Sequence, residues 1–85
     1  MLKITTTNLH GAGVSLQLEG RLSGPWVPEL AGVCESLLAD GRRVTLQLAE
    51  VEFLDASGIQ LLQKLQRRGV QLTACSPFVA AQLNS

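Results

Sequence analysis

Apolar and polar residues alternate in four short stretches of the chain, at residues 2–7, 14–19, 44–48 and 70–75. Alternation places successive side chains on opposite faces of a strand, so each stretch predicts a β-strand with one face in the core. Asn8, Gly11 and Gly13 predict that a turn at residues 8–13 joins the first two strands into a hairpin. Four alternating strands indicate a sheet with one polar face, because a parallel sheet covered on both faces has continuous apolar runs.

Two further segments repeat apolar residues at helical spacing. The first begins near Trp26–Pro28, where proline is tolerated because the first N–H groups of a helix have no intrahelical acceptor, and it ends at Asp40–Gly41. The second covers residues 59–68. Its apolar face consists of Ile59, Leu62 and Leu65. A short third helix is predicted at residues 78–83, too brief to be stable without docking on the rest of the domain.

The order of these elements is β-β-α-β-α-β-α. A hairpin followed by two right-handed crossovers puts both long helices on the same side of the sheet. We therefore predict one two-layer α/β domain over residues 1–85, with a four-stranded mixed sheet and helices on one face. The other face is expected to be polar, with Ser15, Gln17, Thr45 and Gln47.

Three loops are expected to meet at one edge of this sheet. In a sheet of this topology the loops after the second, third and fourth strands leave at the same edge. These loops are residues 21–26, 50–57 and 76–77. The start of the second long helix opens onto that edge.

The composition is that of a small soluble globule. Of the 85 residues, 46% are hydrophobic and only 4% aromatic, so the core must consist mainly of aliphatic side chains. Seven basic residues balance seven acidic ones, and a chain without net charge lacks the broad positive field that attracts nucleic acid or an anionic membrane. No segment has the ~18 apolar residues of a membrane-spanning helix. The start of the chain also lacks the pattern of a signal peptide, so we expect a cytoplasmic protein.

The two cysteines, Cys34 and Cys75, are expected to be reduced packing residues. They lie in a helical and a strand pattern, where buried thiols are common. Two cysteines cannot complete a four-ligand zinc site, so we expect no metal and no cofactor.

The segment Asp55–Gly58 joins the third strand to the second long helix. Asp55 is the expected N-cap, because its carboxylate can accept a hydrogen bond from a free N–H group of the first turn and favours the positive end of the helix dipole. Such a helix end also binds or presents phosphate, and Ser57 supplies a hydroxyl there. Taken alone, the tetrapeptide is explained as a good cap with a hydroxyl in the first turn.

An enzymatic function is not expected. Ser57 lacks the Gly-x-Ser-x-Gly setting of a nucleophile, and His10 belongs to the far edge of the sheet in this topology. The sequence also contains no Gly-x-x-x-x-Gly-Lys phosphate loop and no evident carboxylate pair. The candidate nucleophile therefore has no evident base within reach.

The order of elements and the segment around Asp55 together resemble the STAS family, the domain named for sulfate transporters and anti-sigma factor antagonists. The resemblance covers nearly the whole chain. The residues that carry it are Leu18–Leu22, Arg43–Leu48, Phe53–Leu62 and Gly69–Thr73. It implies a STAS-like fold and a small bacterial protein-binding module. Such a module, similar to an anti-sigma factor antagonist, docks onto a switch kinase or another protein in signal transduction and transcription regulation.

Two residues depart from the pattern of the family. In members that are switched by phosphorylation, the acceptor serine or threonine follows the acid of the signature, and Ala56 stands at that position here. A hydroxyl remains one residue later, at Ser57, and Gln47 replaces an acidic residue that is common in the preceding strand. Ser57 is therefore the candidate phosphorylation site. Because the usual acceptor is missing, we expect the unmodified protein to be the working form.

Relatives without the standard acceptor leave two alternatives open. One is an accessory subunit that binds the ATPase of a phospholipid-transporting ABC system in Gram-negative bacteria. The other is a chemoreceptor-linked signalling module. A homodimer is also left open.

The predicted binding surface surrounds the loop and helix that follow Asp55. Since the apolar positions of this helix face the sheet, its polar side chains remain for a partner. These are Gln60, Gln63, Lys64 and Arg67. The cap residues at one end of the surface are Asp55, Ala56 and Gly58. Trp26 either fills the end of the core or anchors a partner. The pair Arg67–Arg68 predicts a solvated helix end.

Overall fold

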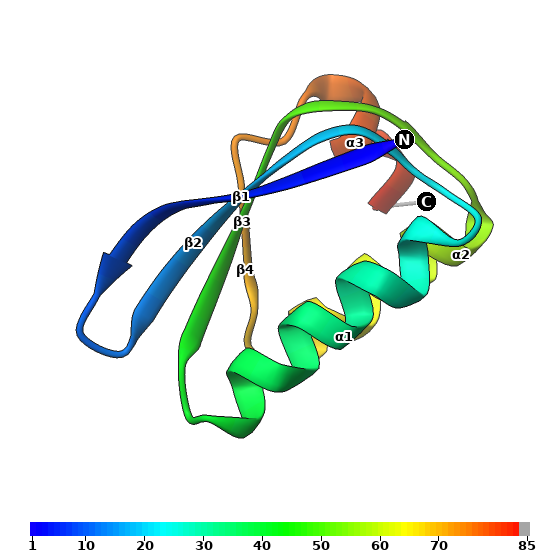
Figure 1. Ribbon diagram of the computed structural model, residues 1–85. Helices are drawn as coiled ribbons and strands as arrows, with labels where there is room; N and C mark the ends of the chain where they lie inside the picture. Colours follow the sequence, from blue (N-terminus) through cyan, green and yellow to red (C-terminus); the bar gives the residue numbers. More distant parts are fainter. Residues whose placement is uncertain (84–85) are drawn as a thin grey trace.

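All four strands belong to one sheet, in the order β1-β2-β3-β4 (Figure 1). The computed structural model describes residues 1–83, except for the side chains of residues 8–10. β1 is antiparallel to β2, and β3 is parallel to both β2 and β4. The sheet is therefore mixed, as predicted. The elements are β1 (Leu2–His10), β2 (Gly13–Leu22), α1 (Trp26–Ala39), β3 (Arg43–Leu54), α2 (Ala56–Arg67), β4 (Gln71–Thr73) and α3 (Pro77–Leu83).

The helices form a second layer on one face of the sheet (Figure 1). α1 contacts β2 and β3, while α2 and α3 contact β3. The strand residues that face this layer are fully or almost fully buried, among them Leu16, Leu18, Leu46 and Leu48. The polar residues predicted for the opposite face are partly exposed there, namely Ser15, Gln17, Thr45 and Gln47. The prediction of a two-layer α/β fold is confirmed. No helix within residues 1–83 is long and apolar enough to cross a membrane.

The hairpin turn is tighter than the sequence predicts. The two strands extend to His10 and from Gly13, so only Gly11 and Ala12 connect them. Gly11 has a φ of +55°, which glycine adopts at little cost. The predicted turn at residues 8–13 is wrong because an irregularity in register between Thr6 and Asn8 lets the strand continue through Asn8. The side chain of His10 lies outside the described residues.

Both later strands also differ from their predicted lengths. β3 continues to Leu54, although alternation stops at Ala49 and Glu50, which are both exposed. Gln17 of β2 pairs with Gln47, but Glu19 pairs with Glu50, so β3 contains one extra residue between these pairs. This bulge shifts the alternation of β3 by one residue without ending the strand. β4 ends at Thr73.

The end of β4 departs from the predicted alternation at Ala74. Ala74 has a φ of +56° and is exposed, and the turn that it makes brings Cys75 partly into the core. The alternation had predicted that Ala74 faces the core, whereas the position of Cys75 agrees with the packing role predicted for it. Ser76 then caps α3, since its Oγ accepts a hydrogen bond from the N–H of Val79 at 3.2 Å. Val79 is fully buried and docks this short helix on the domain.

Candidate functional site

Asp55 begins α2 as the sequence predicts. Its backbone is extended, with φ −87° and ψ 178°, while its side chain turns toward the helix. Oδ1 accepts hydrogen bonds from the N–H of Gly58 and from the Oγ of Ser57, each at 2.7 Å. The N-cap is therefore confirmed, and the hydroxyl of Ser57 is engaged by the cap.

The second oxygen of the same carboxylate holds the loop between β2 and α1. Oδ2 accepts a hydrogen bond from the N–H of Gly24 at 2.9 Å. The N–H of Asp55 in turn donates to the carbonyl of Leu22 at 3.3 Å. We call this group, formed by Asp55 with Gly24, Ser57 and Gly58, the Asp55 clamp. It joins the loop between β2 and α1 to the junction of β3 and α2, two places whose meeting the topology predicted. The loop predicted at residues 50–57 is wrong, because β3 continues to Leu54 and α2 begins at Ala56, so only Asp55 connects them. Contact of residues 76–77 with this junction stays a prediction.

The Asp55 clamp favours an ionised carboxylate. The N–H groups of Gly24 and Gly58, followed by the hydroxyl of Ser57, hold the pKa of Asp55 below its usual range. Each of these donors binds a charged acceptor more strongly than a neutral one. The clamp therefore keeps a fixed negative charge at the start of α2 at neutral pH.

Gly58 is required by a close approach of two backbones. A Cβ atom at this position would lie 2.5 Å from the carbonyl oxygen of Leu22 and 3.2 Å from its Cγ. Gly58 is accordingly buried, whereas Ala56 and Ser57 are exposed beside it. The signature glycine thus lets the first turn of α2 pack directly on the end of β2.

The exposed surface of α2 contains most of the predicted binding residues. Gln60, Lys64 and Arg67 are exposed. Gln63 is only partly exposed, because its Nε2 donates to the carbonyl of Leu83 at 3.2 Å and so ties α3 to α2. Trp26 is also half-buried and packs against the core at the start of α1. Its contacts are those of the core alternative, with part of the ring left exposed.

The comparison with protein families classifies this arrangement. The family model described as "Mlab, STAS domain" matches residues 5–85. The chain belongs to the STAS family. No curated protein sequence matches the chain.

Two solved structures are similar to this STAS domain. The structure titled "Structure of the Anti-Sigma Factor Antagonist SpoIIAA in its Unphosphorylated Form" superimposes with a TM-score of 0.78 at 18% sequence identity, covering 96% of this chain and 82% of that one. The one titled "Crystal Structure Analysis of Mglu" has a TM-score of 0.66 and 25% identity, and covers 82% of this chain and 19% of that one. At 18% identity, the similarity to the anti-sigma factor antagonist structure shows the fold alone.

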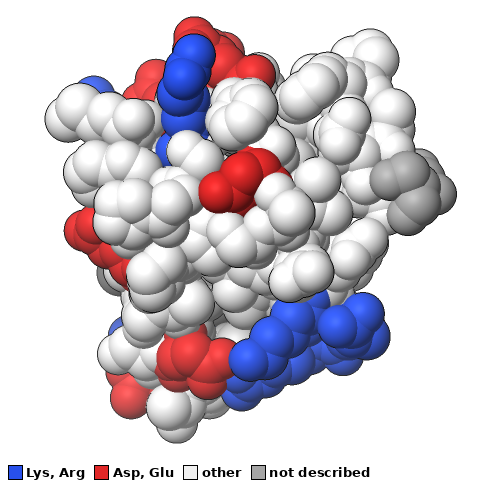
Figure 2. All heavy atoms as spheres, turned by 90° about the vertical axis from the view of Figure 1, so that its right-hand side faces the viewer, with Lys and Arg blue, Asp and Glu red and all other residues white. Residues whose placement is uncertain are grey.

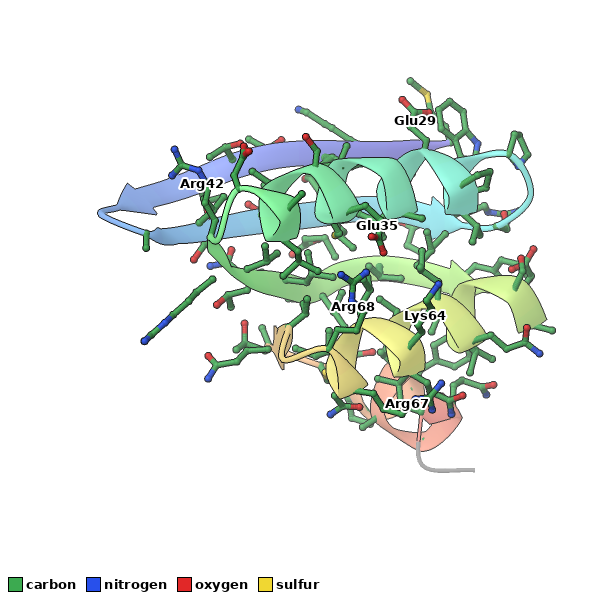
Figure 3. All side chains as sticks on the ribbon, turned by 90° about the horizontal axis from the view of Figure 1, so that it is seen from below. Glu29, Glu35, Arg42, Lys64, Arg67 and Arg68 are labelled. Carbon is green, nitrogen blue, oxygen red and sulfur yellow. The ribbon has the colours of Figure 1, made fainter. Side chains whose placement is uncertain are left out.

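An ion pair between the two long helices was not predicted. The guanidinium of Arg68, after the end of α2, contacts the Oε1 of Glu35 on α1 (Figure 3). Arg67 and Arg68 are both exposed, as predicted for a solvated helix end, but Arg68 is in addition held by this ion pair. The hydrogen bond from Arg68, with the positive charges of Arg68 and Lys64, lowers the pKa of Glu35. No local pattern could have revealed this pair, because its residues are 33 positions apart.

A second unpredicted contact lies near the clamp. The guanidinium carbon of Arg21 stands 5.6 Å from the ring centroid of Phe53, within the range of a cation–π interaction. These residues are paired in the register of β2 and β3. Phe53 remains 41% exposed, so an aromatic surface lies at the end of β3, next to Asp55.

Proposed function

We propose that this STAS domain is a protein-interaction module, similar to an anti-sigma factor antagonist, that regulates a partner through the loop and helix after Asp55. The observation that carries the proposal is the Asp55 clamp. It fixes the loop between β2 and α1 and the first turn of α2 while Ala56, Ser57 and Gln60 stay exposed. A surface held in one conformation loses little entropy when a partner binds. STAS domains are typically non-catalytic regulatory modules, which agrees with this role.

The unmodified domain is the proposed working form. Ala56 has no hydroxyl, and the hydroxyl of Ser57 already donates to Asp55. A phosphate on Ser57 would remove that hydrogen bond and add about two negative charges beside an ionised carboxylate. The dipole of α2 favours a negative charge at its start, but Asp55 already occupies the N–H of Gly58. These contacts support a constitutive module more than a switch at Ser57.

A second candidate function is an accessory subunit that binds the ATPase of a phospholipid-transporting ABC system. Two observations favour it: the matching family model is described as "Mlab, STAS domain", and Ala56 stands at the acceptor position. A chemoreceptor-linked signalling module is the remaining alternative. These three functions differ in the partner protein, and in each of them the partner docks on α2.

Affinity capture from the native cells, followed by mass spectrometry, tests these functions together. The wild-type domain is expected to retain one of three partners: a switch kinase, an ABC ATPase or a chemoreceptor-linked protein. Lys64→Glu should lose the partner with little change in melting temperature, because Lys64 is exposed. Lys3→Glu is the control, since it makes the same change of charge at an exposed lysine on β1, away from α2. If only variants with a disrupted core lose the partner, the surface of α2 is wrongly assigned.

A further inference from the structure

Positive side chains gather at the C-terminal end of α2. Lys64, Arg67 and Arg68, which we call the α2 basic cluster, follow one another at helical spacing and are all exposed. Figure 2 shows positive side chains collected on the part of the surface over α2, with acidic side chains beside them. Figure 3 shows that the labelled side chains of Lys64 and Arg68 lie toward α1, while Arg67 lies nearer α3.

One carboxylate of the chain already binds within this cluster. Glu35 projects from α1 between Arg68 and Lys64 (Figure 3) and pairs with Arg68. The hydrogen bond from Arg68, together with the charges of Arg68 and Lys64, lowers the pKa of Glu35, so the cluster favours a charged carboxylate at that point. Lys64 and Arg67, in contrast, have no carboxylate within 4.0 Å among the residues that the structure describes. The cluster thus binds one carboxylate and leaves two cations without an ion pair.

We propose that the α2 basic cluster is the docking site for an acidic protein surface, with Glu35 occupying part of that site from within the domain. This inference rests on the proposed function, to which it adds the chemistry of the partner. A partner carboxylate would pair with Lys64 or Arg67 and would compete with Glu35 for Arg68. Complementary charges of this kind mainly accelerate association and select the partner.

The surroundings of the cluster favour an acidic protein over a nucleic acid or an anionic membrane. The basic and acidic residues of the whole chain cancel, seven against seven. Glu35, which projects from the neighbouring helix into the cluster, would repel a row of phosphates laid along it. Binding to a polyanion draws on many phosphate contacts, whereas three cations on one helix end suit a few discrete carboxylates.

Glu35→Gln gives a test in which binding improves. The substitution releases Arg68 and removes a negative charge from the cluster. The association rate of the captured partner should therefore rise, roughly threefold at low ionic strength, and the gain should shrink in high salt. Glu29→Gln makes the same change of charge on α1 but away from the cluster (Figure 3), so it should leave the rate nearly unchanged.

Zero-length carbodiimide cross-linking tests for direct contact between the α2 basic cluster and the partner. The chain has two lysines, and Lys64 should join to aspartate or glutamate peptides of the captured partner. The Nζ of Lys3 lies 3.9 Å from the Oε2 of Glu19. Lys3 should therefore cross-link only within the domain, and it serves as the internal control. Arg67→Glu should lower the association rate roughly tenfold, since it replaces an attraction by a repulsion. Its folding can be checked separately by circular dichroism.

The outcomes separate this inference from the proposed function. If the wild-type domain retains no partner, both fail. If a partner binds but Glu35→Gln and Arg67→Glu leave its association rate unchanged, the inference alone is overturned. Cross-links from Lys64 to Glu29 of a second copy would also overturn it. So would binding of the purified domain to anionic vesicles or to a single-stranded oligonucleotide, if Arg67→Glu abolishes that binding.

Discussion

Replacing Gly58 with alanine tests the close approach on which the functional site is built. Gly58 lies in the first turn of α2, and a Cβ atom there would stand 2.5 Å from the carbonyl oxygen of Leu22. Real Cβ contacts essentially never fall below 3.0 Å, so the start of α2 and the end of β2 must separate. The same carbonyl accepts the N–H of Asp55 at 3.3 Å, so the separation also disturbs the Asp55 clamp.

Two opposing effects set the size of the change. Overpacking of a tight site costs about 1–3 kcal/mol of unfolding free energy, while alanine gains up to about 1 kcal/mol over glycine within a helix. The atom in the way belongs to the backbone and cannot rotate aside, so the overpacking cost should prevail. We expect Gly58→Ala to destabilise the domain by about 1–2 kcal/mol, which lowers the melting temperature by about 4–8 °C for each kcal/mol.

Gly32→Ala is the matched control on the other long helix. Gly32 lies within α1 and a Cβ atom there would meet nothing within 4 Å, so only the propensity gain remains. This variant should be more stable than the wild type by about 0.5–1 kcal/mol. Urea titrations followed by circular dichroism and by the fluorescence of Trp26, the only tryptophan, measure both changes. Stabilisation by both substitutions would refute the close approach at Gly58.

Three further predictions concern charge, thiols and modification. Because the pKa of Asp55 is lowered in the folded state, its stabilising contribution is present above the ordinary aspartate pKa of ~3.9 and is lost as the pH falls below it. Asp55→Asn should therefore flatten the acid side of the stability–pH curve in urea titrations, and an unchanged curve would contradict the clamp. Burial raises the pKa of the Cys34 thiol to about 11, so iodoacetamide at pH 8 should alkylate the half-buried Cys75 well before Cys34; mass spectrometry showing equal rates would contradict this packing. Intact-mass measurement of the domain from its native cells should show no phosphate, and Ser57→Asp should weaken partner binding without unfolding; a large phosphorylated population mapped to Ser57 would restore the switch.

The sequence predicted the features that depend on neighbouring residues. Alternation located all four strands, because period-two burial follows from strand geometry alone. The cap at Asp55 was also predictable, since its acceptor and the donor of Gly58 are three positions apart. Alternation failed where the chain departs from regular geometry: at the bulge of β3 that precedes Glu50, and at Ala74 with its positive φ.

The contacts that complete the site join distant parts of the chain. The N–H of Gly24 is 31 positions from the carboxylate that it binds, and Glu35 is 33 positions from Arg68. A topology can predict that two loops meet, but it does not fix which atoms bond. The Asp55 clamp and the α2 basic cluster therefore emerged only from the folded chain.

Photo-cross-linking from α2 in the native cells tests the central claim most directly. A photoreactive residue at Gln60, on the exposed side of α2, should capture one protein in a defined adduct. The same residue at Gln17, on the sheet face that carries no helix, should capture none. Adducts formed from Gln17 but not from Gln60 would contradict docking through the loop and helix after Asp55.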